Sequence, residues 1–156
     1  MPLHPLPKAE EMNNAVTMLY TMEAGCEPAE EVDLDEVTHF AVYVNDDDEP
    51  VAGIGCTLEF GAYAGAALSM IPKGGADEAV QASELSEMML GNLNEFMNIC
   101  SRWFMTADSP HLRLTATYPI DDLPDEADDL LDSEDRIDFN IDIPDYGSGQ
   151  IVCVTT

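Results

Sequence analysis

Basic side chains are scarce in this chain of 156 residues. Lys and Arg together number 5, whereas Asp and Glu number 32, so the formal net charge is -27 at neutral pH. A surface this negative repels DNA, RNA and anionic membranes, which all carry dense negative charge. The composition therefore argues against functions that depend on binding a nucleic-acid backbone or a membrane surface.

Long apolar runs and paired cysteines are absent as well. Charges, Gly or Pro interrupt every apolar stretch, and the N-terminal segment MPLHPLPKAEE lacks the basic start and apolar centre of a signal peptide. No Cys-x-x-Cys pair occurs, which favours buried small apolar side chains over disulfides or zinc ligands for Cys26, Cys56, Cys100 and Cys153. We expect one soluble, cytoplasmic domain over residues 1–156.

The first half of the chain alternates between helical and extended patterns. Apolar residues at helical spacing predict a helix over residues 8–24, followed by an acidic connection that ends at residue 37. Two runs rich in β-branched and aromatic residues, 38–44 and 51–60, flank the turn-forming NDDDEP and predict a hairpin. The small-residue stretch 61–71 fits either a helix or a strand, and we favour a helix.

The second half contains the longest helical pattern, from residue 77 to residue 105. Residues 111–118 predict a strand with its apolar side chains on one face. Nine of the fifteen residues in 121–135 are acidic, so we expect a surface loop with at most a short helix. A final hairpin is predicted over 137–143 and 150–154. Together these elements predict an α+β fold with an antiparallel or mixed sheet, covered by helices on one side.

The long helical segment is amphipathic. At 100° per residue, one side collects large apolar residues and must face the core; they are Leu85, Met89, Leu93, Phe96, Cys100, Trp103 and Phe104. The opposite side is polar and collects Glu84, Glu87, Gly91, Asn94, Glu95, Asn98, Ser101 and Arg102. A solvated helix face is the ordinary explanation of such a pattern. Glu95 and Asn98 are nevertheless a carboxylate and an amide one helical turn apart, which suits contact with another molecule.

The segment SELSEMMLGNLNEFMNICSRWF resembles the signature helix of the CheC/CheX chemotaxis phosphatase family, in which Glu-x-x-Asn-Ile recurs on one long helix. Here the motif reads Glu95-Phe96-Met97-Asn98-Ile99. The family pattern also has a small or acidic residue four positions before the Glu and a proline about twenty positions after the Asn. Gly91 is a departure from the first of these features, and Pro119 lies near the place of the second.

The resemblance implies a CheX-like fold with one long central helix, and removal of the aspartyl phosphate from a response-regulator receiver domain. It implies that Asn98 positions the attacking water and that Glu95 pairs with a lysine of the receiver. Gly91, Asn94 and Arg102 are candidate partner contacts on the same face. No cofactor of its own is expected, and the receiver supplies the Mg²⁺. Because only one Glu-x-x-Asn site is present, we also expect a homodimer.

Three further features of the sequence each allow more than one explanation. The acidic residues 45–49 lack the alternation and central Gly of a calcium-binding loop, so we interpret them as a hairpin turn. His4, His39 and His111 are isolated from other metal ligands, and no metal site is predicted. The acidic excess leaves open a non-catalytic interaction module, which either sequesters a receiver or mimics nucleic acid for a basic protein through residues 121–135.

Overall fold

A computed structural model describes residues 6–8, 10–11, 14, 25–105, 109–143 and 145–155. Most of the predicted helix over residues 8–24, and also His4, lie outside these residues. The strands are β1 (Gly25–Pro28), β2 (Val37–Val44), β3 (Pro50–Thr57), β4 (Arg113–Pro119), β5 (Asp135–Ile143) and β6 (Gly147–Thr155). The helices are α2 (Leu58–Leu68), α3 (Lys73–Ala82), α4 (Glu87–Cys100) and α5 (Asp125–Leu131), with 3-10 turns η1 (Leu34–Glu36), η2 (Ser101–Phe104) and η3 (Ile120–Asp122).

The six strands form one sheet in the order β1-β5-β6-β3-β2-β4. Every neighbouring pair is antiparallel, including the two hairpins β2-β3 and β5-β6. Both predicted hairpins are therefore confirmed, as is the α+β fold class. The Asn45 side chain closes the first hairpin by accepting hydrogen bonds from the backbone N–H groups of Asp47 and Glu49 at 2.9 and 3.0 Å. The turn interpretation of residues 45–49 is thus correct.

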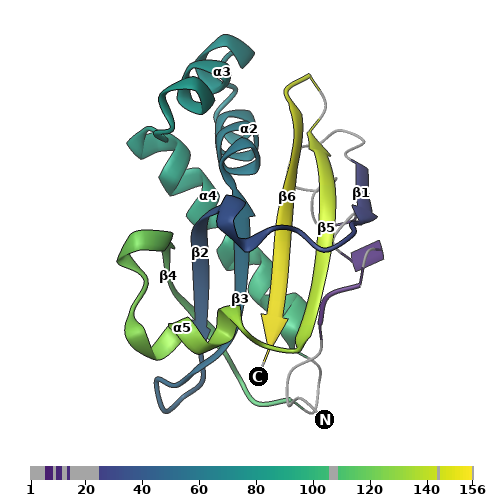
Figure 1. Cartoon of the computed structure of the whole chain (residues 1–156), viewed down its shortest axis with the longest axis vertical. Helices are drawn as coiled ribbons and strands as arrows, with labels where there is room; N and C mark the ends of the chain where they lie inside the picture. Colours follow the sequence, from purple (N-terminus) through teal and green to yellow (C-terminus); the bar gives the residue numbers. More distant parts are fainter. Residues whose placement is uncertain are drawn as a thin grey trace.

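Helices cover both faces of the sheet, so the prediction of a one-sided cover is wrong. α2 and α4 pack on one face, and α5 lies across the other, with α5 nearer the viewer and α4 behind the strands (Figure 1). Leu123 and Leu130, the apolar anchors of the acidic segment 121–135, are buried in the cluster under α5. The segment does contain only a short helix, as predicted, but it closes a second small core.

The predicted helical run from residue 77 to residue 105 is divided into two helices. Ser83 adopts a left-handed backbone conformation with φ 54° and ends α3. Ser86 then starts α4, because its hydroxyl accepts a hydrogen bond from the backbone N–H of Met89 at 3.2 Å. The apolar periodicity continues through the break, which is why the pattern alone predicted a single helix.

The small-residue stretch is helical, as favoured, although α2 begins earlier than expected, at Leu58, where Thr57 caps it. Small residues let α2 approach α4 closely. A Cβ on Gly65 would lie 2.7 Å from the carbonyl oxygen of Met89. Asn92 of α4 also donates hydrogen bonds to the Gly65 carbonyl at 2.8 Å and to the Ser69 hydroxyl at 2.6 Å. These contacts hold α4 firmly against α2.

The edge strand β4 does not keep one apolar face. The register of β4 against β2 shifts between Ala116 and Leu114. Leu112 and Leu114 consequently pack in the core under α2 and α4, whereas Tyr118 packs in the cluster under α5. The predicted single-faced alternation over 111–118 is therefore wrong, because the irregularity reverses the side on which later side chains lie.

Candidate functional site

α4 presents one buried and one exposed side. Of the predicted core positions, Leu85, Met89, Leu93, Phe96, Cys100 and Phe104 are buried and Trp103 is partly buried. The Tyr43 hydroxyl donates a hydrogen bond to the Met97 carbonyl at 2.5 Å, which joins the helix to the C-terminal end of β2. The helix is thus fixed along its inner side, so the positions of the residues on its outer side are well defined.

The outer side carries the sequence-predicted site residues. Gly91, Asn94, Glu95, Asn98 and Arg102 are all exposed, and we call this row the α4 stripe. Glu95 and Asn98 are three residues apart, so their side chains lie on neighbouring positions of one helix surface. The structure therefore brings the carboxylate and the amide together at the surface, where a second macromolecule can reach both.

Two residues of the α4 stripe have informative surroundings. The side-chain oxygen Oδ1 of Asn94 accepts a hydrogen bond from the Thr117 hydroxyl of β4 at 3.0 Å. A Cβ built on Gly91 would meet nothing within 4 Å, so the absence of a side chain there is not required by packing. Gly91 instead leaves the helix backbone open to close approach.

Asn98 lies in the last turn of α4. Its backbone carbonyl accepts hydrogen bonds from the backbone N–H and the hydroxyl of Ser101, the latter at 2.7 Å. Within the described part of the chain, no hydrogen bond engages the Asn98 side-chain amide and no ion pair includes Arg102. The chemistry available along the stripe is therefore one exposed carboxylate, exposed amides and one cation at its end.

Sequence reasoning missed Asn92 and Ser86, which position the stripe. Asn92 lies between the buried and exposed sides and binds α2, as described above. Periodicity gives no signal for this role, because the partner carbonyl comes from a residue 27 positions away. Ser86 did carry a signal, since a serine followed by an acidic residue is typical of a helix start.

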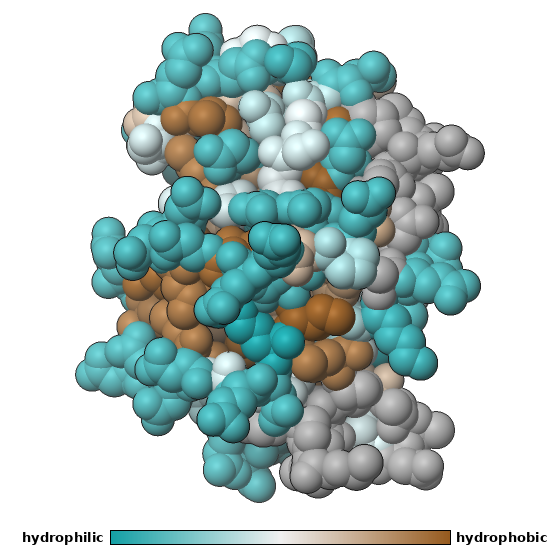
Figure 2. Space-filling view, turned by 45° about the vertical axis from the view of Figure 1, so that its right-hand side comes forward, coloured by the Kyte–Doolittle hydropathy of each residue, from teal (hydrophilic) through white to brown (hydrophobic). Residues whose placement is uncertain are grey.

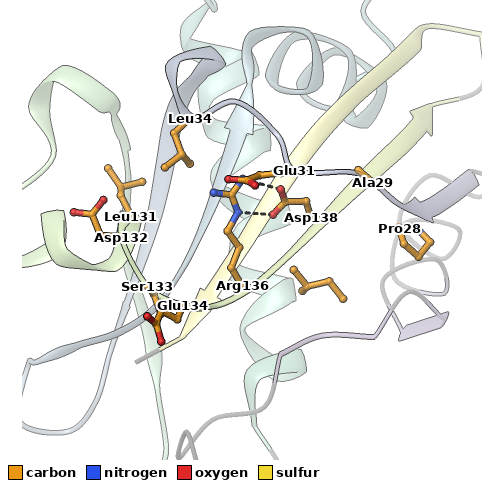
Figure 3. Close-up of a pocket in the computed structure, with 11 residues that line it drawn as sticks. Pro28, Ala29, Glu31, Leu34, Leu131, Asp132, Ser133, Glu134, Arg136 and Asp138 are labelled. Carbon is orange, nitrogen blue, oxygen red and sulfur yellow. Dashed lines mark hydrogen bonds and ion pairs between the residues drawn. The ribbon is translucent and has the colours of Figure 1, made fainter.

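A separate cavity of about 600 Å³ lies on the α5 side of the sheet (Figure 3). Arg136 faces it, but the guanidinium is engaged by Asp138, with Nε and Nη2 at 2.8 and 2.7 Å from the two carboxylate oxygens. Hydrogen bonding to Asp138 raises the pKa of Arg136. The other ionisable residues around the cavity are acidic, namely Glu31, Asp132 and Glu134. This arrangement does not offer a free cation to an anionic ligand.

The cysteines and histidines that the structure describes do not form a second functional site. Cys56, Cys100 and Cys153 are buried, as expected for small apolar side chains, and Cys26 is partly exposed. Burial raises the pKa of Cys26 and of Cys56 to about 12, so both thiols are protonated at neutral pH. Among the described residues, no group of three or more His, Cys, Asp or Glu side chains is placed to hold a metal ion.

The molecular surface reflects the composition. Figure 2 shows hydrophilic residues over most of one face, with apolar residues gathered in separate patches between them. In the described residues, no helix is both long and apolar enough to cross a membrane.

No family model and no curated relative matches the sequence, so comparison rests on three-dimensional structure. A chain of the H. pylori FliM–SpeE complex matches with a TM-score of 0.63 and 11% identity, covering 94% of this chain and 81% of that one. FliY of Thermotoga maritima matches with a TM-score of 0.53 and 13% identity, covering 93% and 82%.

The complex of CheX with CheY, BeF3 and Mg²⁺ from Borrelia burgdorferi also matches, with a TM-score of 0.55 and 14% identity. The match covers 92% of this chain and 91% of that one, so nearly the whole of both chains is aligned. The protein described here therefore has the fold shared by CheX, FliY and the FliM middle domain, which is the CheX-like fold that the resemblance of the α4 segment implied.

Proposed function

We propose that this protein binds a response-regulator receiver domain and hydrolyses its aspartyl phosphate. One observation carries the proposal: Glu95 and Asn98 are both exposed and one turn apart on α4, whose opposite side is buried in the core of a CheX-like fold. The structural relative from Borrelia burgdorferi was crystallised with CheY, BeF3 and Mg²⁺, and this supports a receiver domain as the partner.

The chemistry of the two side chains suits this reaction. Hydrolysis of an acyl phosphate requires a water molecule in line behind the phosphorus atom, and catalysis depends mainly on positioning. A neutral amide can orient that water without placing negative charge beside the phosphoryl oxygens. Asn98 takes this role in the proposal. Glu95 pairs with a receiver lysine and so fixes how α4 approaches the phosphorylated site.

The metal in this scheme belongs to the partner. The receiver supplies the Mg²⁺ that neutralises the phosphoryl oxygens, and this chain contributes no cofactor of its own. Asn94 and Arg102 contact the receiver surface beside the site, and Gly91 lets the receiver come close to the helix backbone. This division of roles requires the α4 stripe to fit over a receiver site that already holds its metal and phosphate.

The test is phosphate release from purified phosphorylated receiver domains. We expect the wild-type chain to accelerate release, and Asn98→Ala to lower the maximal rate about 100-fold while the affinity changes little, because positioning is lost. Glu95→Gln should mainly raise KM. Asp128→Asn on α5 is the matched control for Glu95→Gln, since it removes the negative charge of an exposed carboxylate on the opposite face. Equal rates for wild type and Asn98→Ala would contradict the catalytic role.

A non-catalytic receiver-binding module is the second candidate, and the open position at Gly91 favours it. The family pattern allows an acidic side chain there, whereas a glycine offers a partner no side-chain contact at that point. Structural relatives include FliM in complexes with FliG and with SpeE. Tight binding of phosphorylated receivers without faster phosphate release would identify the protein as a sequestering module.

The single Glu-x-x-Asn site also bears on assembly. We include a cytoplasmic homodimer in the proposal, because two copies present two α4 stripes. Light scattering coupled to size-exclusion chromatography measures the molar mass directly. A mass near the 17.0 kDa of one chain at all concentrations would contradict the dimer and leave the receiver-binding proposal intact.

A further inference from the structure

Two methionines stand apart from the other large apolar side chains of the described residues. The side chain of Met70 is 85% exposed and that of Met88 is 57% exposed, whereas the other large apolar residues described are buried or partly buried. When a partner covers exposed apolar side chains of this size, their removal from water contributes a favourable free energy of binding.

Met70 occupies a backbone position that disfavours it. Its φ of 55° is left-handed, and it follows the last turn of α2 in the place where glycine is usual. The Met70 N–H bonds to the Ala67 carbonyl at 3.2 Å, and the Ile71 N–H bonds to the Ala66 carbonyl at 2.9 Å. A glycine would make the same two bonds with less strain. The requirements of the helix end therefore do not explain the methionine.

The backbone beside Met70 is also held in place. The carbonyl of Ile71, the next residue, accepts a hydrogen bond from the Tyr146 hydroxyl of the β5-β6 turn at 2.6 Å. On the other side of Met70, the Ser69 hydroxyl accepts the hydrogen bond from Asn92 of α4. The exposed side chain thus projects from an anchored turn, which gives a contact surface a defined position.

Met88 lies on the same side of α4 as the stripe. It precedes Glu95 by seven residues, close to two full helical turns, so the two side chains point in nearly the same direction. It also precedes Asn92 by four residues, and Asn92 reaches Ser69, the residue before Met70. Met70 and Met88 consequently lie on either side of the hydrogen bond from Asn92 to Ser69, at the N-terminal end of the α4 stripe.

From this placement we infer that Met70 and Met88 form an apolar anchor that extends the α4 stripe and packs against an apolar patch of the receiver domain. The inference rests on the proposed function. The charge that the partner must carry follows from the exposed carboxylates Glu84, Glu87 and Glu95, which precede and follow Met88 in the chain. Lys73, three residues after Met70, is already paired with Asp77 at 3.1 Å. The partner patch must therefore be apolar at its centre and basic at its rim. Methionine side chains are flexible and adapt well to such a surface.

The test combines affinity and turnover. The probes are purified receiver domains loaded with beryllofluoride and Mg²⁺ for binding, and phosphorylated receivers for turnover. We expect Met70→Gly and Met88→Ala each to weaken binding about tenfold, as loss of a buried methionine contact does. The maximal rate of phosphate release at saturating receiver should stay unchanged. Asn98→Ala should show the reverse behaviour, with a lower rate and unchanged affinity.

Ser83→Gly is the matched control for Met70→Gly. Ser83 is also left-handed and ends α3 with the same pair of bonds, from Ser83 N–H to Val80 and from Glu84 N–H to Ala79. Both glycine variants should unfold at the same or a higher temperature than wild type, because each relieves a left-handed side chain. Only Met70→Gly should weaken receiver binding.

The possible failures are distinguishable. If wild type binds the receiver and both methionine variants bind equally well, the anchor is overturned while the proposed function stands. If Met70→Gly weakens binding but also lowers the unfolding temperature, a structural effect explains it and the anchor is again overturned. If the wild-type chain binds no receiver, the proposed function fails, and the receiver-binding anchor fails with it.

Discussion

The two faces of the sheet are closed in different ways. Under α2 and α4, the core contains most of the largest buried side chains, including Phe60, Phe96 and Phe104, and the two helices touch through a glycine. Under α5, a smaller apolar cluster adjoins a buried ion pair, in which the Arg136 and Asp138 side chains are 16% and 5% exposed. Shape complementarity dominates the first face, and hydrogen-bonded charge supports the second.

This difference has a functional consequence. The face closed by apolar packing carries the α4 stripe, so its candidate residues stand on a helix that is anchored along its whole inner side. The α5 face carries the seven-residue helix that forms the middle of the acidic segment 121–135. Precise positioning, as phosphoryl transfer requires, is available on the first face. The second face contributes charge and closes the sheet.

The largest expected effect is on the α5 face. Arg136→Ala removes the cation that Asp138 pairs with and leaves a buried carboxylate, which still accepts a hydrogen bond from the Val32 N–H at 2.7 Å. It also removes the bond from the guanidinium to the Val32 carbonyl. We expect the free energy of unfolding to fall by about 3 kcal/mol, measured by urea denaturation.

A double variant separates the ion pair from simple packing. Arg136→Met with Asp138→Leu replaces both charges by apolar groups, so no buried charge is left alone, and it should cost less than Arg136→Ala. Arg102→Ala at the exposed end of the stripe should change stability by less than about 0.5 kcal/mol. If Arg136→Ala were as mild as Arg102→Ala, the α5 face would not depend on its ion pair.

On the face covered by α2 and α4, the free energy of unfolding should instead depend on side-chain volume. In Gly65→Ala the new Cβ would lie 2.7 Å from a carbonyl oxygen and 3.0 Å from the Met89 Cα, both backbone atoms that cannot rotate away. We expect a loss of about 2 kcal/mol in the free energy of unfolding. Urea denaturation, followed by circular dichroism, measures this loss.

Gly91 gives the matched control on the same pair of helices. A Cβ there meets nothing, and alanine is the better helix former, so Gly91→Ala should stabilise the chain by up to about 1 kcal/mol. Similar stabilities for the two alanine variants would show that α2 and α4 are not closely packed at Gly65. The pair thus measures shape complementarity without introducing charge.

The strands of the sheet and the α4 stripe could be predicted from the sequence because both depend on local periodicity. Alternation in Ile137, Phe139, Ile141 and Ile143 requires a strand with one face in the core, and all four contribute to the core beneath α2 and α4. The apolar side of α4 follows from the 3.6-residue repeat in the same way. The exposure of Glu95 and Asn98 is the complement of that pattern.

The remaining features depend on contacts between distant segments. The register shift in β4 arises from its pairing with β2, and the cover of the second face depends on where α5 docks. Neither leaves a periodic signal in the chain. The bonds from Asn92 to α2 likewise require knowledge of which carbonyl lies opposite. Ser86 is different, since its capping pattern is local and was overlooked within a continuous apolar repeat.

The smallest expected effect comes from His39, near the start of β2, where it pairs with Pro119 of β4. Burial lowers the pKa of His39 below its ordinary value, because the charged imidazolium loses water in the folded state. The unfolded chain therefore binds the proton more readily, and folded stability is full above the ordinary histidine pKa and falls as pH drops through the folded-state value. His39→Asn should abolish this part of the pH dependence.

The measurement is the difference in free energy of unfolding between wild type and His39→Asn at pH 7.5, 6.0 and 5.0. The comparison cancels the titration of the many carboxylates, whose common contribution appears in both proteins. Asparagine can keep a hydrogen bond to the Thr38 hydroxyl, which lies 2.8 Å from Nδ1 of His39. Wild type should lose stability relative to the variant as pH falls. Parallel curves would show that His39 binds its proton equally well in the folded and the unfolded chain. Burial of His39 where β2 pairs with β4 would then not make the stability depend on pH.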